Sequence, residues 1–212
     1  DGDTSATATV NITINDDAPT FTAGSVENKT VDEEGINGNP GAPDPYAATD
    51  YPNQETTASG GLGISWGADK GNSGAANRSL AFSGFVEGNP VLNDAGVAIT
   101  SHGAAVKYHL ITNGDTQTLI GYIGNDANNS NNYVFSVTLD DTTTTGTYNF
   151  TLFKNLDHPT VNSEDDISIK FNFIAQDADK DTVAGSFKVT VDDDSPIITL
   201  ASIQNGGVDE DN

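Results

Sequence analysis

The 212-residue sequence contains no cysteine and no methionine, one tryptophan, and only 8 lysines and arginines against 31 aspartates and glutamates. Without cysteine, neither a disulfide nor a zinc site with thiolate ligands can form. The formal net charge of -23 argues against binding to nucleic acid or to anionic membranes, because both need basic patches. An apolar run long enough to insert into a bilayer and an N-terminal signal peptide are also missing. The first residues resemble the middle of a module, so we expect a piece of a longer chain.

Such acidity alone is typical of disorder, but short runs of alternating apolar and polar residues indicate strands. Glycine, asparagine, aspartate, proline or serine bounds each run, and no segment has a helical period with caps. The pattern predicts an all-β fold, an antiparallel β-sandwich with long irregular loops. The expected strands are 8–15, 62–66, 105–111, 118–123, 133–139, 146–153, 167–175 and 185–191.

The alternating phenylalanines and tyrosines of 133–139 and 146–153 are expected to form one wall of the core rather than a binding stripe. Two segments read as long loops. Residues 35–61 are rich in proline, glycine and asparagine, and residues 66–79 directly follow an expected strand. Loops this long inside a domain are usually functional or disordered.

The two ends of the sequence repeat one another. Residues 1–19 (DGDTSATATVNITINDDAP) align with 179–196 (DKDTVAGSFKVTVDDDSP), and Pro19 and Pro196 stand 177 positions apart, as do Val31 and Val208. We therefore expect tandem modules. Residues 1–17 would hold the last strand of a preceding module and a linker, 18–191 the module itself, and 192–212 a linker and the start of the next module.

Carboxylates gather beside the proline of each linker and again a few residues downstream. Calcium binds about six to eight oxygen ligands and suits such clusters, and the proline stiffens the junction. We expect a calcium ion at each junction that neutralises the acids and aligns adjacent modules; solvated acidic turns are the alternative. The candidate ligands are Asp16, Asp17, Asp32, Asp193 and Asp194.

Three further aspartates, Asp177, Asp179 and Asp181, alternate at the start of a predicted strand. This spacing resembles the opening of an EF-hand loop, but the glycine at the sixth position and the glutamate at the twelfth are missing. We interpret the segment as a structural calcium site, because the spacing lets the three carboxylates converge in a turn.

Several segments together resemble the repeat module of giant repeats-in-toxin (RTX) adhesins of Gram-negative bacteria, and more narrowly their calcium-dependent peptide-binding domain. The segments are LGISWGAD…NRSLAF, VFSVTLDD…GTYNFTL, LDHP, DADKDTVAGSF and VDDDSP, in this order along residues 15–200. The resemblance implies type I secretion, display on the bacterial cell surface, calcium-dependent folding, and capture of the free C-terminal peptide of host-surface proteins by a monomeric module. It implies cell adhesion, host colonisation and biofilm formation rather than catalysis.

A bound calcium would let so acidic a domain accept a terminal carboxylate. In the loop 66–79, Asp69 and Asn77 are the first candidates to hold that ion, with Asn72 and Asp157 next. Arg78 would make a bidentate contact with a ligand carboxylate, and Trp66 would pack against a ligand side chain. The alternatives are a core tryptophan, an arginine paired with nearby acids, an aspartate that caps a turn, and a calcium that only shapes the loop.

Three rival functions remain open. A structural extender of the array would not need long loops, and a carbohydrate-binding module would use exposed aromatic residues, here Tyr46, Tyr51 and Trp66. An enzyme is disfavoured, because His102, His109 and His158 belong to no nucleophile elbow or zinc-protease motif and no phosphate-binding loop occurs. Asp157 and His158 are adjacent at the end of an expected strand, which by itself forms no catalytic relay because neighbours in a strand point to opposite faces. Glu164, Asp165 and Asp166 form a further acidic run.

Overall fold

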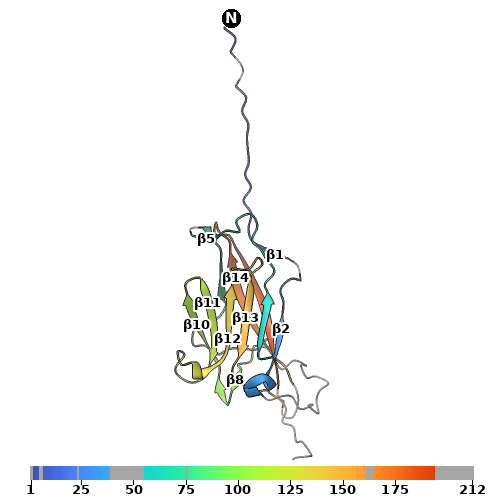
Figure 1. Ribbon diagram of the computed structural model, residues 1–212, viewed down its shortest axis with the longest axis vertical. Helices are drawn as coiled ribbons and strands as arrows, with labels where there is room; N and C mark the ends of the chain where they lie inside the picture. Colours follow the sequence, from blue (N-terminus) through green and yellow to red (C-terminus); the bar gives the residue numbers. More distant parts are fainter. Residues whose placement is uncertain are drawn as a thin grey trace, which may run out of the picture.

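A computed structural model describes residues 2–4, 7–22, 24–38, 55–74, 76–160 and 165–193 of the chain. Two sheets pack face to face as a β-sandwich, which confirms the predicted all-β fold (Figure 1). Within the described residues, no helix is long and apolar enough to cross a membrane.

The larger sheet has five strands in the order β10-β11-β12-β13-β3, and every neighbouring pair is antiparallel. Four of its strands coincide with predicted runs. The bounds are β3 Thr57–Gly61, β10 Lys107–Asn113, β11 Thr116–Tyr122, β12 Tyr133–Asp140 and β13 Thr147–Leu152.

The second sheet has four strands in the order β2-β15-β14-β7. Its strands are β2 Lys29–Asp32, β7 Ser79–Ser83, β14 Ile167–Gln176 and β15 Thr182–Asp192. The β2–β15 pair is parallel, unlike the rest of the sandwich, and its register sets Asp32 opposite Asp192. A parallel pair needs a long crossover, so it carries acids from distant parts of the chain to one sheet end.

Short elements decorate the ends of the sandwich. They are β1 Thr20–Phe21 paired with β4 Ile64–Ser65, the β5 Asn72–Ser73 and β6 Ala76–Asn77 hairpin, the β8 Thr100–Ser101 and β9 Ala104–Ala105 hairpin, and the 3-10 helices η1 Glu33–Gly38 and η2 Ser130–Asn132.

Aromatic rings from both sheets meet in the core, as predicted. Tyr148 of β13 stacks on Phe187 of β15 with ring centroids 3.8 Å apart, and Phe135 of β12 meets Phe171 of β14 edge-on at 5.8 Å. Phe150 stacks on Phe135 at 5.5 Å. Alternation along the strands sends these rings inward and the polar residues outward, so the aromatic residues act as core.

Strand β3 lies inside the segment 35–61, which the sequence predicted to be a loop, and that expectation is wrong for 57–61. The glycines of this strand are typical of loops, but Gly60 is needed for close packing. A Cβ on Gly60 would lie 2.5 Å from the ring of Tyr148, its cross-strand partner. The glycine therefore leaves room for that ring, whose hydroxyl donates to the Glu27 carbonyl at 2.8 Å.

The N-terminal segment leaves the sandwich and forms no strand over 7–19 (Figure 1). Its apolar residues Val10, Ile12 and Ile14 are 80–91% exposed. Their repeat equivalents in β15, aligned through the 177-residue offset, are Phe187, Val189 and Val191, which are at most 1% exposed. The same apolar face is thus core in one copy of the repeat and bare in the other.

Candidate functional site

Acidic side chains gather in two clusters, next to elements that lie at opposite ends of the sandwich in Figure 1. The linker pole, where the N-terminal segment meets the domain, consists of Asp16, Asp17, Asp69, Asp177, Asp179 and Asp181. The far pole, beside η1, consists of Asp32, Glu33, Glu34, His158, Asp192 and Asp193. The predicted metal ligands fall into these two clusters, with the exceptions given below.

At the linker pole, the turn between β14 and β15 folds around Asp177. Its Oδ1 accepts hydrogen bonds from the N–H groups of Lys180, at 3.1 Å, and Asp181, at 2.9 Å. Lys180 adopts a positive φ of 93°, which tightens the turn. One carboxylate oxygen each from Asp177, Asp179 and Asp181 lies within 4.8 Å of the others. The convergence expected from their alternate spacing is confirmed.

Two other segments bring carboxylates to the same place. Asp16 of the N-terminal segment and Asp69 of the loop 66–79 lie with Asp179 in a second group within 4.8 Å. The Asp69 carbonyl accepts the N–H of Ala178 at 3.0 Å, which ties the loop to the turn. Asp179 thus belongs to both groups and links the linker, the loop and the turn.

Asp17 anchors the linker through the loop backbone. Its Oδ2 accepts the N–H of Ala68 at 2.8 Å. Gly67 has a φ of 67°, and a Cβ at this position would lie 1.9 Å from Asp17 Oδ2. A glycine is therefore required for the linker carboxylate to approach the loop.

The linker pole is electrostatically frustrated. Burial raises the pKa of Asp177 to about 6, with Asp179 adding to the effect. Burial, followed by the charges of Asp179 and Asp17, raises the pKa of Asp69, and the nearby Asp179 charge raises that of Asp16. Asp177 Oδ2 is buried and has no hydrogen-bond partner among the described residues. Like charges this close favour a bound cation or a proton.

The far pole corrects one sequence expectation. The sequence predicts that Asp32 lies with Asp16 and Asp17 at one junction, but β2 carries Asp32 along the sandwich to the opposite end. There it stands opposite Asp192, and its Oδ1 accepts the N–H of Glu34 at 2.8 Å. Asp193, also a predicted ligand, lies in one group with Glu33 and His158. Asp194 lies outside the described residues.

Four carboxylates of the far pole are buried, those of Asp32, Glu33, Glu34 and Asp192. Glu33 Oε1 accepts the N–H of Leu156 at 2.6 Å and lies 3.4 Å from His158 Nε2. The metal ligands predicted from the sequence do not include Glu33, Glu34, His158 or Asp192. The acid run VDEEG was a visible signal, whereas the arrival of His158 depends on tertiary packing.

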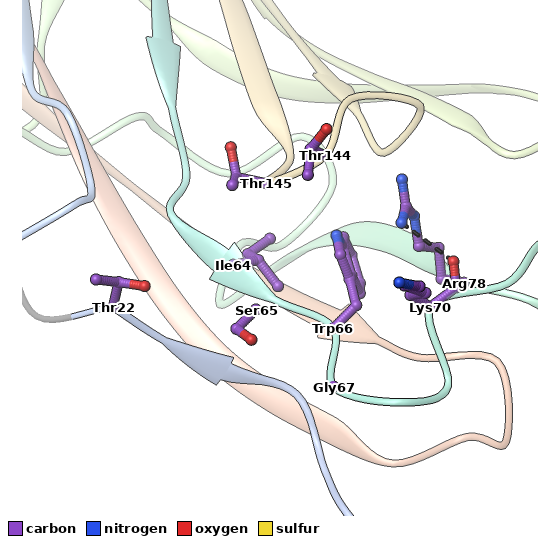
Figure 2. A pocket seen from close by; sticks show the side chains of 9 residues that line it. All are labelled: Thr22, Ile64, Ser65, Trp66, Gly67, Lys70, Arg78, Thr144 and Thr145. Carbon is purple, nitrogen blue, oxygen red and sulfur yellow. Dashed lines mark hydrogen bonds between the residues drawn. The ribbon is translucent and has the colours of Figure 1, made fainter.

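The loop 66–79 does line a cavity of about 340 Å³, together with Thr22, Ile64, Thr144 and Thr145 (Figure 2). Trp66 is buried, which agrees with the alternative that it is a core residue. Its Nε1 has no hydrogen-bond partner among the described residues. The guanidinium carbon of Arg78 lies 4.7 Å from the centroid of the indole. Lys70, also on this cavity, is exposed.

Arg78 is not free for the predicted bidentate contact. Nε and Nη2 donate to the Asp141 carbonyl at 3.0 and 2.6 Å, Nη2 to the Thr143 carbonyl at 2.8 Å, and Nη1 to the Lys70 carbonyl at 3.2 Å. These bonds use most N–H groups of the guanidinium. Arg78 therefore joins two loops, and a ligand carboxylate would have to displace one of these carbonyls to make a bidentate hydrogen bond with Arg78.

The residues predicted to bind calcium together with Asp69 have other hydrogen-bond partners in the structure. Asn72 and Asn77 face each other in the β5–β6 hairpin; Asn72 Nδ2 donates to the Asp141 carbonyl and Asn77 Nδ2 to Asp115 Oδ2. Asp157 lies by the β8–β9 hairpin, at the other end of the sandwich from β5 (Figure 1), and accepts the Gly103 N–H at 2.8 Å. Asp157 therefore does not join a site with Asp69.

The remaining candidates have local roles or lie outside the described residues. His109 is on β10, and its Nδ1 lies 2.6 Å from Glu87 Oε1. His102 occupies the β8–β9 turn with a φ of 52°. Tyr46, Tyr51 and Glu164 lie outside the described part of the chain. Asp165 Oδ1 is buried without a hydrogen-bond partner among the described residues, and Asp166 is exposed.

No protein-family model matches the sequence, and no curated protein or solved structure matches it either.

Proposed function

We propose that this chain is a calcium-dependent module of a secreted bacterial surface adhesin, and that calcium at the linker pole fixes the linker onto the sandwich. One observation carries the proposal. Carboxylates from three segments remote in sequence, represented by Asp16, Asp69 and Asp179, converge within 4.8 Å. The extender alternative is thereby favoured over ligand capture, because the cluster lies where modules would join.

The donor set fits calcium. All six side chains of the linker pole are carboxylates, and calcium prefers hard oxygen ligands in flexible arrangements. The buried Asp177 Oδ2, which lacks a hydrogen-bond partner in the described part of the chain, is an orphaned acceptor of the kind a cation satisfies. A divalent cation here would relieve the mutual repulsion of these groups.

The tandem arrangement draws support from the N-terminal segment. Val10, Ile12 and Ile14 are bare, while their repeat equivalents Phe187, Val189 and Val191 are buried in β15. The N-terminal run therefore has the side-chain pattern of a β15 strand whose sheet belongs to another module. Asp16 and Asp17, directly after this run, reach the linker pole of the following sandwich.

The test is thermal unfolding of the full chain in chelator, calcium and magnesium. Calcium at about 100 times its dissociation constant stabilises by about 2.7 kcal/mol, which raises the melting temperature by roughly 5–11 °C for a domain of this size. Asp69→Asn should reduce this gain, whereas Asp3→Asn, an exposed acid outside the clusters, should not. Identical curves in chelator and calcium would contradict the proposal.

Ligand capture is a second candidate, favoured by the cavity beside the linker pole. Trp66, Lys70 and Arg78 line it, and a peptide C-terminal carboxylate would pair there with the ammonium of the exposed Lys70. Binding would then depend on calcium, because the adjacent acids must be neutralised first. Glycans are the alternative ligand.

A screen of peptides with free and amidated C-termini, beside a glycan array, separates these ligands. Carboxylate capture predicts binding in calcium that is lost on amidation and weakened by Lys70→Gln. Binding that ignores amidation, or binding to glycans alone, would remove this candidate without touching the calcium proposal.

A further inference from the structure

The far pole contains a group that differs in chemistry from the linker pole. Glu33 at the start of η1, His158 in the segment after Leu156, and Asp193 at the end of β15 each place one ligand atom within 4.8 Å of the others. Two carboxylates and one imidazole therefore meet at one point, whereas the linker pole offers only oxygen ligands.

His158 is the informative member of this group. Its side chain is 3% exposed and that of Glu33 1% exposed. Neither ring nitrogen of His158 makes a hydrogen bond to any described residue, although Nε2 lies 3.4 Å from Glu33 Oε1. A buried imidazole normally has its nitrogens satisfied, so this ring, directed at two carboxylates, indicates a missing partner.

The surroundings favour a cation as that partner. The carboxylates of Asp32, Glu34 and Asp192 are buried in the same pole and add negative charge around the group. Asp165, with a buried oxygen that has no hydrogen-bond partner in the described part of the chain, lies close enough to raise the pKa of His158. The Leu156 N–H holds the Glu33 carboxylate in place at 2.6 Å.

We propose that Glu33, His158 and Asp193 bind a borderline divalent cation, with Zn²⁺ as the representative, in preference to Ca²⁺. An imidazole nitrogen is a good ligand for Zn²⁺ and Co²⁺ and a poor one for Ca²⁺, which takes oxygen. The two carboxylates balance the ion's charge, and water completes its coordination. The inference goes beyond the calcium proposal and does not depend on it, because it concerns the opposite end of the sandwich.

The competing occupant is a proton. Burial lowers the pKa of His158, but Glu33, Asp193 and Asp165 raise it more, so an imidazolium paired with Glu33 is the alternative state. Metal and proton cannot occupy the same ring nitrogen. A measurement that reports on the ring itself therefore distinguishes them.

The first experiment titrates the full chain with Zn²⁺ by calorimetry in saturating Ca²⁺, so that the linker pole is already occupied. We expect one Zn²⁺ site that survives the excess Ca²⁺ and whose affinity falls at least about tenfold in His158→Gln. His109→Gln is the matched control, because His109 lies on β10 beside Glu87, and it should bind as the parent does. Equal affinities for the parent and His158→Gln would overturn the proposal.

A second measurement needs no variant and covers the case in which His158→Gln does not fold. The chain has three histidines, so their ring nitrogens are resolvable by long-range ¹H–¹⁵N correlation. Zn²⁺ should shift one ring set in slow exchange, and Co²⁺ should broaden the same set. Ring signals that keep an imidazolium pattern at pH 7 throughout the titration would show that a proton occupies the group and would refute the proposal.

Discussion

Replacing Arg78 tests whether this side chain holds the loops together or waits for a ligand. Arg78→Ala would remove the guanidinium donors of three carbonyls: that of Lys70, that of Asp141, which keeps only Asn72 Nδ2 at 3.3 Å, and that of Thr143, which keeps only the Gly146 N–H at 3.5 Å. Each part-buried carbonyl that loses its guanidinium donor costs up to about 1–3 kcal/mol, and the lost stacking on Trp66 costs about 1 kcal/mol. Water can enter the adjacent cavity and satisfy part of the loss, so we expect a net destabilisation of about 3–4 kcal/mol.

The assay is urea unfolding in saturating calcium, followed by the fluorescence of the single tryptophan. Arg78→Lys keeps the charge but loses the planar fork, so it should recover less than half of the loss. Lys70→Ala is the matched control, because Arg78 bonds to the carbonyl of Lys70 and not to its side chain; a change within about 0.5 kcal/mol is expected for this exposed position. Destabilisation by Arg78→Ala below about 1 kcal/mol would refute the structural role.

Three further outcomes follow from the structure. Asp179→Asn should lower the melting temperature in calcium but leave it equal or higher in chelator, because the residue belongs to both linker-pole groups; a decrease in both conditions would contradict a metal role. Deleting residues 1–14 should leave the melting temperature of the sandwich within about 2 °C, since Val10, Ile12 and Ile14 are exposed; a larger loss would mean that the segment packs on the domain. Because the pKa of Asp177 is raised to about 6, its contribution to the stability of the metal-free protein is fully present below about pH 4 and is lost as the pH rises through 6. The calcium-induced gain in melting temperature should therefore grow between pH 5 and 7, and a gain independent of pH would count against a role for Asp177.

The strands that the sequence predicted well are those in which one face is buried along the whole length. In β12–β15, alternation places phenylalanine, tyrosine and valine on the core side at every second position, so the period alone identifies them. Strand β3 was not predicted because Gly60 and Gly61 interrupt the alternation of apolar and polar residues. The glycine at position 60 is explained by the ring of Tyr148, which is close only in the folded structure.

Candidate sites formed by residues close in sequence were predictable, and those formed by distant residues were not. The Asp177–Asp181 turn is local, so its spacing was sufficient to predict convergence. The position of Asp32 depends on a parallel pairing with β15, and that of His158 on packing against η1; neither has a signature within a short window of sequence. Arg78 and Asn77 looked available because their partners, the Asp141 carbonyl and Asp115, come from other loops.

We propose that carboxylates from the linker, the loop and the β14–β15 turn hold one calcium ion in common. The most direct test is an anomalous difference map from a crystal of this chain grown in calcium. We expect a peak about 2.3–2.6 Å from oxygens of Asp16, Asp69 and Asp179, absent from a crystal grown in chelator. A map without a peak at this cluster, with these carboxylates turned apart into solvent in calcium, would contradict it.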